Sequence, residues 1–155
     1  MMKMAHLKKI TFQDYVLLVI ALVVAVWGVH SSRAAVLSGE LTSSVYDTGA
    51  TSSINTVMWQ GTLPTDTTVR FQIASSNCLN GATNAPTCST GNWSYLGNDG
   101  SITTYYTPSA PNVQVPLRSA DHNSKRYFRY KLFMISDADG ISTPTITKII
   151  IGWSR

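Results

Sequence analysis

Residues 67–75 read TTVRFQIAS, and this stretch has the alternation of a half-buried β-strand. Val69, Phe71 and Ile73 fall on one side of such a strand with polar residues between them, because successive side chains of a strand point to opposite faces. A strand with one buried and one wet face is typical of an antiparallel sheet. The stretch therefore predicts a strand whose odd-numbered residues pack into a hydrophobic core.

A second long segment, KRYFRYKLFMI at residues 125–135, also predicts a strand. Its even-numbered face, with Phe128, Leu132 and Met134, is the better candidate for the core. Shorter segments bounded by turn residues predict further strands at 41–47, 54–60, 93–96, 102–107, 113–117 and 145–152. About eight short strands predict a mainly β fold, an antiparallel jelly-roll-like sandwich over residues 40–155 that follows an N-terminal hydrophobic α-helix.

Charged residues make up only 13% of the chain, and its formal net charge is +4. Residues 1–30 carry three lysines and one aspartate, and the rest of the chain carries nine basic and seven acidic side chains. The region that holds the predicted strands is therefore close to neutral. A nucleic-acid-binding domain has a strongly basic face, so the charge pattern argues against a nucleic-acid partner.

The sequence YVLLVIALVVAVWGV at residues 15–29 has no charged side chain. Extended back to Ile10 it would form a helix about 30 Å long, which can cross a bilayer. Lysines precede it, so the positive-inside rule places the N-terminus in the cytoplasm and the polar remainder outside. The predicted order is a basic cytoplasmic leader at 1–9, a transmembrane or filament-core helix at 10–29, a linker at 30–39 and an extracytoplasmic sandwich at 40–155.

A cleavable signal peptide is an alternative for the same residues. It would have the basic start, the apolar run and a small-x-small cleavage site at Ser32, Arg33 and Ala34. Asp14 argues against it, because a carboxylate at the start of the apolar run is costly to desolvate without a partner. The alternatives are therefore a membrane-anchored protein and a secreted one.

The segment KKITFQDYVLLVIALVVAVWG resembles the N-terminus of a type IV pilin or pseudopilin. In that family a short basic leader precedes a hydrophobic mature segment with an acid at its fifth position. The resemblance makes Ile10 the first mature residue and Asp14 the fifth, and it implies that Asp14 meets the N-terminal amine of a neighbouring subunit. It further implies self-association, with the chain anchored in the inner membrane or assembled in an extracellular filament.

The outer region is similar to β-sandwich modules of bacterial surface proteins, which are related in shape to carbohydrate-binding jelly rolls. The likeness rests on spaced segments that include SSVYDTG at 43–49, MWQG at 58–61 and RYF at 126–128. Such spaced core residues imply a fold more than an activity.

The two cysteines, Cys78 and Cys88, flank a loop of turn-forming residues. In an exported domain this pattern predicts a disulfide, which stabilises by about 2 to 3 kcal/mol through closure of a short loop. The three histidines, His6, His30 and His122, are scattered along the chain. The sequence therefore predicts neither a metal site nor a cofactor.

Tyr105 and Tyr106 are candidate ligand-binding residues. Neighbouring residues of a strand cannot both point inward, and exposed tyrosine rings can stack on the faces of sugars. An anchored or secreted carbohydrate-binding module, with a glycan as its partner, is therefore an alternative function.

Asp-Thr-Gly at residues 47–49 raises another alternative, a dimeric aspartic protease. Such an enzyme needs Asp47 in a loop facing its symmetry mate and a flap over the substrate, and the sequence shows no convincing flap. In the simpler interpretation a strand ends at Asp47, whose side chain caps the following turn while Gly49 takes a positive φ. The sequence as a whole predicts a non-catalytic surface protein, a pilin-like or membrane-anchored subunit that displays a sandwich for filament assembly or adhesion.

Overall fold

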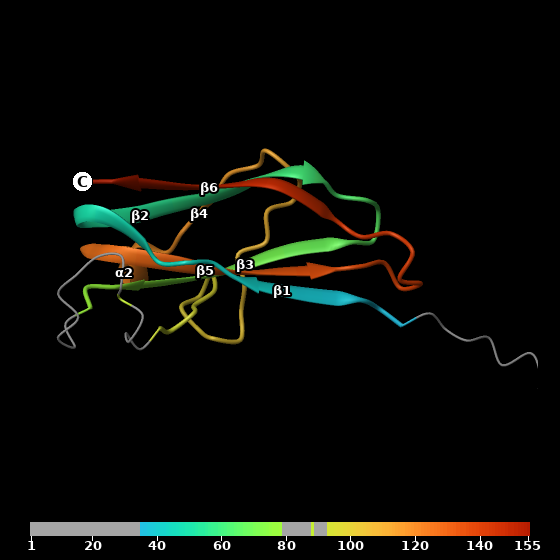
Figure 1. Cartoon of the computed structure of the whole chain (residues 1–155), viewed down its shortest axis with the longest axis horizontal. Coiled ribbons are helices and arrows are strands. Elements are labelled where there is room, and N and C mark those ends of the chain that lie inside the picture. The colour runs from blue at the N-terminus through green and yellow to red at the C-terminus, as the bar shows by residue number, and fades with distance from the viewer. Residues whose placement is uncertain (1–34, 79–87, 89–92) are drawn as a thin grey trace, which may run out of the picture. The chain divides into compact units, whose positions relative to one another are not determined.

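The computed structural model describes residues 35–78, 88 and 93–155 (Figure 1). The strands are β1 (Ser38–Thr42), β2 (Tyr46–Thr62), β3 (Thr68–Ser76), β4 (Val115–Pro116), β5 (Lys125–Ile135) and β6 (Thr145–Ser154), and one short helix, α2, spans Ser119–His122. Every strand pairing is antiparallel. The prediction of a mainly β, antiparallel fold is therefore confirmed.

The long strand β2 organises the sheet, because its two halves pair with different neighbours. Tyr46, Asp47 and Ser52 pair with β5, whereas residues 53–62 pair with β6 and residues 56–57 pair on the other side with β4. The register shifts between Asp47 and Ser52, and such a bulge bends a strand. The strands therefore form two hydrogen-bonded groups, or ladders. One ladder contains β1, the start of β2, β5 and β3, and the other contains β6, the rest of β2 and β4 (Figure 1).

The hydrophobic core contains residues from both ladders. Trp59 and Val57 come from the second half of β2, and Phe71 comes from β3; all three are fully buried. From β5, Phe128 and Leu132 join the same cluster. The predicted core faces of 67–75 and 125–135 are therefore confirmed.

Residues 93–114, which precede β4, close one side of this core. Tyr106 exchanges two backbone hydrogen bonds with Phe71, and Leu96 exchanges two with Ile73. These bonds lie along the edge of β3 that does not pair with β5. The Tyr106 ring is buried in the core, and its hydroxyl accepts a hydrogen bond from the Arg118 N–H at 3.0 Å. This segment fills the space between the ladders on that side.

The prediction of about eight strands is wrong, because the described residues form six. The predicted strand 41–47 is divided between β1 and β2, and 54–60 is the middle of β2 rather than a strand of its own. The turn-forming residues that separate these two segments bend a continuous strand instead of ending it. The hydrogen bonds and the ion pair at the bend outweigh the preference of these residues for a turn that would end the strand.

The predicted strands 93–96 and 102–107 are also wrong. Each supplies one bridging residue, Leu96 and Tyr106, and 113–117 contributes only the two residues of β4. Glycine- or proline-containing turns follow the first two segments and redirect the chain before a ladder can extend.

The predicted leader at 1–9 and helix at 10–29 lie outside the described residues. Within the part of the chain that the structure describes, no helix is long and apolar enough to span a bilayer. Residues Ala34–Arg155 form one compact unit, and β1 begins at Ser38, within the segment predicted as the linker.

Truncation of Phe71 tests whether the two ladders enclose one core. Phe71→Ala leaves a cavity at a side chain that is 0% exposed, so we expect the free energy of unfolding to fall by about 3 to 5 kcal/mol in denaturant titrations. The matched control is Ile102→Ala, at a side chain that is 71% exposed, with an expected change within about 0.5 kcal/mol. Equal losses in the two variants would contradict the described core.

Candidate functional site

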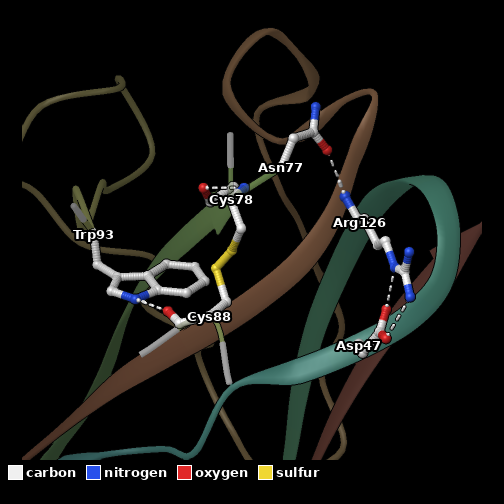
Figure 2. Close-up of a disulfide and its surroundings, with 7 residues drawn as sticks. Asp47, Asn77, Cys78, Cys88, Trp93 and Arg126 are labelled. Carbon is white, nitrogen blue, oxygen red and sulfur yellow. Dashed lines mark hydrogen bonds and ion pairs between the residues drawn. A yellow bond between two sulfur atoms is a disulfide. The ribbon is translucent and has the colours of Figure 1, made fainter. Parts of the chain in front are cut away.

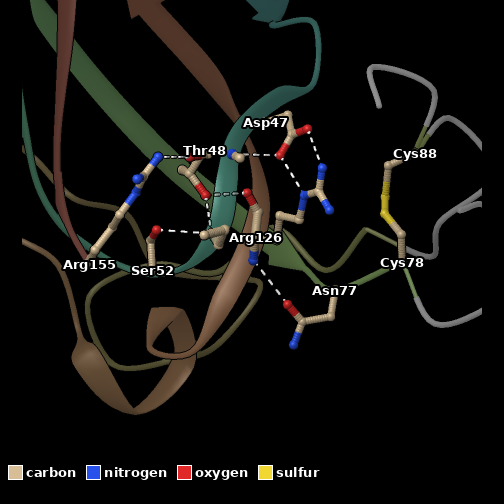
Figure 3. A network of polar contacts seen from close by, with 10 residues as sticks. Asp47, Thr48, Ser52, Asn77, Cys78, Cys88, Arg126 and Arg155 are labelled. Atoms are coloured by element: carbon tan, nitrogen blue, oxygen red, sulfur yellow. Dashed lines mark hydrogen bonds and ion pairs between the residues drawn. A yellow bond between two sulfur atoms is a disulfide. The ribbon is translucent and has the colours of Figure 1, made fainter. Parts of the chain in front are cut away.

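An ion pair between Asp47 and Arg126 lies at the bend of β2 (Figure 3). Arg126 Nε donates to Asp47 Oδ1 at 2.8 Å, and Arg126 Nη2 donates to Asp47 Oδ2 at 2.9 Å. The Asp47 side chain is only 17% exposed. A two-pronged pair of this kind fixes the orientation of both groups, which a single contact between exposed charges does not. The bend of β2 is thereby fastened to β5.

Thr48 and Gly49 complete the bend. The Gly49 N–H donates to Asp47 Oδ1 at 2.8 Å, and Gly49 has a φ of +78°, a conformation that glycine adopts without strain. The buried Thr48 hydroxyl lies 2.7 Å from the carbonyl oxygen of Arg126, to which it can donate. Arg155 Nη2 donates to the Thr48 carbonyl at 3.2 Å (Figure 3). The bend is thus tied to β5 and to the C-terminal residue.

This bonding gives Asp47 a structural role. The hydrogen bond from Arg126 holds the pKa of the Asp47 carboxyl below its usual value, whereas the carboxylates of an aspartic protease must share a proton. Asp47 does cap the turn and Gly49 does have a positive φ, as the sequence predicts. The strand does not end at Asp47, however, because β2 continues to Thr62.

Sequence reasoning missed Arg126 as the partner of Asp47. The signal was weak: Arg126 is the one charged residue on the even-numbered face of 125–135, but it stands at the start of the strand and its side chain is 40% exposed. Nothing in the local pattern connects it with Asp47, 79 residues earlier.

Cys78 and Cys88 form the predicted disulfide (Figure 2). Both cysteines are buried and pack with Tyr127, and the partly buried Val45 and Trp93 cover them. Trp93 Nε1 donates to the Cys88 carbonyl oxygen at 3.2 Å. The disulfide therefore belongs to a second, smaller hydrophobic cluster.

Asn77 links the disulfide to the bend of β2. Its Oδ1 accepts a hydrogen bond from the Arg126 N–H at 2.9 Å (Figures 2 and 3). Its Nδ2 donates to the Ser124 carbonyl at 2.9 Å. Asn77 directly precedes Cys78 in the chain. The disulfide, the start of β5 and the ion pair are therefore one connected structural unit.

The two tyrosines predicted to bind a ligand have different surroundings. Tyr106 is 1% exposed, so it has no ring face to offer and the prediction of its exposure is wrong. Tyr105 is half-buried; its ring meets Phe133 edge-on at a centroid distance of 5.1 Å, and the Arg70 guanidinium lies 4.3 Å from its centroid. Sugar binding through Tyr105 stays a prediction.

His122 is a buried histidine that the sequence did not single out. It is 1% exposed, its Nδ1 lies 3.0 Å from Ser75 Oγ, and Ser75 Oγ donates to the Asp121 carbonyl at 3.2 Å. The donor in the bond between Ser75 Oγ and Nδ1 depends on the tautomer of the ring. Burial lowers the pKa of His122 to about 4, so its imidazole is neutral at neutral pH.

Among residues 35–78, 88 and 93–155, no three His, Cys, Asp or Glu side chains come together in a way that could hold a metal ion. Ile10 and Asp14, the residues predicted to act in assembly, lie outside this range. No protein-family model, no curated protein and no solved structure matches the chain. Its function must therefore be argued from its own residues.

Loss of the Asp47 charge should weaken the bend. Asp47→Asn keeps the side-chain shape but breaks the charge pair, and we expect the midpoint of thermal unfolding to fall by about 3 to 6 °C. The control is Glu40→Gln, which breaks the Glu40–Lys131 pair, in which Glu40 is 47% exposed, and should shift the midpoint by at most about 2 °C. Equal shifts would show that the Asp47 pair is an ordinary surface contact.

His122 should make the fold sensitive to acid. Its pKa is about 4 in the folded chain against 6.5 for an unperturbed histidine, so between these values the unfolded chain binds more protons. Stability therefore decreases as the pH is lowered through this window and levels off below it, with a total loss of up to about 3 kcal/mol. Denaturant titrations across the window should show this slope in the wild type and lack it in His122→Phe. The same slope in both proteins would assign the effect to other groups.

Proposed function

We propose that this chain is a non-catalytic surface protein, a pilin-like or membrane-anchored subunit that presents its β-domain outside the cell. The observation that carries the proposal is the position of the uncharged residues 15–29, which end just before the compact unit that starts at Ala34. A run of this length and hydrophobicity needs a bilayer or a protein core to cover it. The lysines that precede it set the orientation of the anchor.

The β-domain has features that suit an exported position. A disulfide such as Cys78–Cys88 persists in oxidising compartments and is rare in the cytosol. The two ladders, joined by the bent strand β2, support an open β-sandwich as the displayed module. In this proposal the likeness to a jelly roll concerns the layered arrangement of the strands and not their number.

The polar groups of the domain also favour a non-catalytic role. Asp47 is held ionised by Arg126, and His122 is buried and neutral at neutral pH. A catalytic acid or base needs a pKa near the working pH and access to a substrate. The hydrogen bonds of these two side chains contribute to the stability of the fold instead.

Asp14 is the residue that we assign to assembly, together with Ile10 as the first mature residue. A carboxylate at the start of an apolar run is costly to bury unless a cation lies beside it. In this proposal a positive group of a neighbouring subunit supplies that cation.

The mature N-terminus and the fractionation of the full chain test the proposal. We expect the protein to stay in the membrane or filament fraction after a high-salt wash. Its intact mass should be that of a chain that begins at Met1 or at Ile10. Asp14→Ala should lower the yield of oligomers or filaments, and Gln13→Ala, the matched neighbour, should leave it unchanged. A soluble chain that begins near Ala35 would refute the anchor and favour secretion.

A further inference from the structure

The ladder that contains β3 and β5 carries three cations on the side that faces away from the core. In β5, Leu132 belongs to the core, so Lys131 and Phe133 point to the opposite face. Arg70 of β3 is paired with Phe133, and directly opposite residues of an antiparallel pair share a face. Arg129 stands two residues before Lys131 on β5 and so lies on that face too. Arg70, Arg129 and Lys131 therefore share one side of the ladder, which we call the outer face.

Tyrosine rings lie between the cations of the outer face. The Arg70 guanidinium is 4.3 Å from the centroid of the Tyr105 ring. Arg129 and Lys131 lie beside the ring of Tyr95, at 5.9 and 5.1 Å from its centroid. A cation beside an aromatic ring is held in place by the ring but keeps its charge. The outer face therefore presents positive charges in fixed positions, next to two partly exposed tyrosines.

The positive charge of the outer face is only partly balanced within the described residues. Lys131 Nζ lies 2.6 Å from a carboxylate oxygen of Glu40. Arg70 and Arg129 form no ion pair there, although Arg129 donates a hydrogen bond to the Ser43 carbonyl at 2.7 Å. The Nε atom of each arginine is buried without a hydrogen-bond partner, which is costly for a charged group. An anion beside these guanidinium groups would offset that cost, because it attracts the delocalised charge of the whole group.

The three cations follow one another at a regular spacing. Residues two apart on a strand are separated by about 7 Å, which is the step from Arg129 to Lys131. Arg70 is the diagonal neighbour of Lys131, because it is paired with Phe133, and such neighbours are about 7 to 8 Å apart. The cations therefore form a short row, and a ligand that fits it is a linear polymer with repeated negative charges.

We propose that the outer face binds a polysaccharide of uronic acids, in which each sugar carries a carboxylate. Arg70, Arg129 and Lys131 hold the carboxylates, which match the planar fork of a guanidinium. Tyr95 and Tyr105 exchange hydrogen bonds with the sugar hydroxyls, because a phenol hydroxyl can donate and accept.

Other linear polyanions fit the outer face less well. The carboxylates of an acidic peptide stand on flexible side chains, whose ordering costs more free energy than that of a carboxylate fixed to a sugar ring. Single-stranded nucleic acid stacks its bases on open aromatic faces, and here Arg70 already lies over the ring of Tyr105. These two classes of ligand are therefore the competitors that a test must exclude.

The inference deepens the proposed function in its adhesive form and rests on the export of the β-domain. Polysaccharides are accessible to a domain outside the cell. Binding is nevertheless a property of the outer face, so it can be measured on the purified full chain in detergent, where neither the anchor nor a filament is needed.

Defined oligomers test the class of ligand. The probes are oligogalacturonate and oligomannuronate, and the matched controls are the methyl ester of oligogalacturonate, which lacks the charge, and oligoglutamate, which lacks the sugar. We expect saturable binding of a uronate that weakens with added salt, and binding of both controls that is weaker by about tenfold or more. Absence of saturable binding to both uronates would overturn the proposal. Equally tight binding of oligoglutamate or of a single-stranded oligonucleotide would overturn it as well.

Charge variants test the site. Arg70→Gln and Arg129→Gln should each lower the affinity for the bound uronate by about tenfold. The matched control, Lys148→Gln, removes the same charge from the exposed side chain of β6 in the other ladder and should change the affinity by less than about twofold. Glu40→Gln releases Lys131 and should raise the affinity by about two- to fivefold. A damaged fold cannot produce such a rise. A loss of affinity in Glu40→Gln, or equal losses in Arg70→Gln and Lys148→Gln, would overturn the site.

The two proposals fail in different ways. If the wild-type chain is neither in the membrane fraction nor assembled, the proposed function is refuted whatever the chain binds. If the chain is anchored or assembled but binds neither uronate, only the ligand of the outer face is refuted.

Discussion

The ion pair between Asp47 and Arg126 holds the bend on which the rest of the β-domain depends. Beyond this bend β2 pairs with β5 only at Ser52, and its following residues pair with β6 and β4. The core forms between these two ladders, so the direction in which β2 continues places Trp59 in the same cluster as Phe71. The backbone of Arg126 is also bonded to Asn77, beside the disulfide, so the same residue positions the smaller cluster.

The sequence predicts those parts of the fold whose signals are local. The alternation of residues 67–75 and 125–135 identifies β3, β5 and their core faces, and the two cysteines indicate their disulfide. The course of β2 could not be predicted in this way, because Asp47, Thr48 and Gly49 have turn preferences. What makes this turn a bend within one strand is Arg126, 79 residues further along the chain. The burial of Tyr106 could not be predicted from local sequence either, because it depends on a single long-range bridge to Phe71.

The asymmetry of the domain connects its fold to its proposed function. Residues 96–117 cover one side of the core, and on the other side two hollows of about 460 and 480 Å³ lie beside β6. The chain also carries an uncharged segment that requires cover, ahead of the domain.

Amide hydrogen exchange in Arg126→Gln, compared with the wild type, tests most directly whether the bend holds both ladders. The account predicts faster exchange in residues 46–52 and also in residues 53–62 and in β6, which Arg126 does not contact through its ion pair, because the two ladders lose their common support. Faster exchange confined to residues 46–52, with unchanged protection in β6, would contradict it.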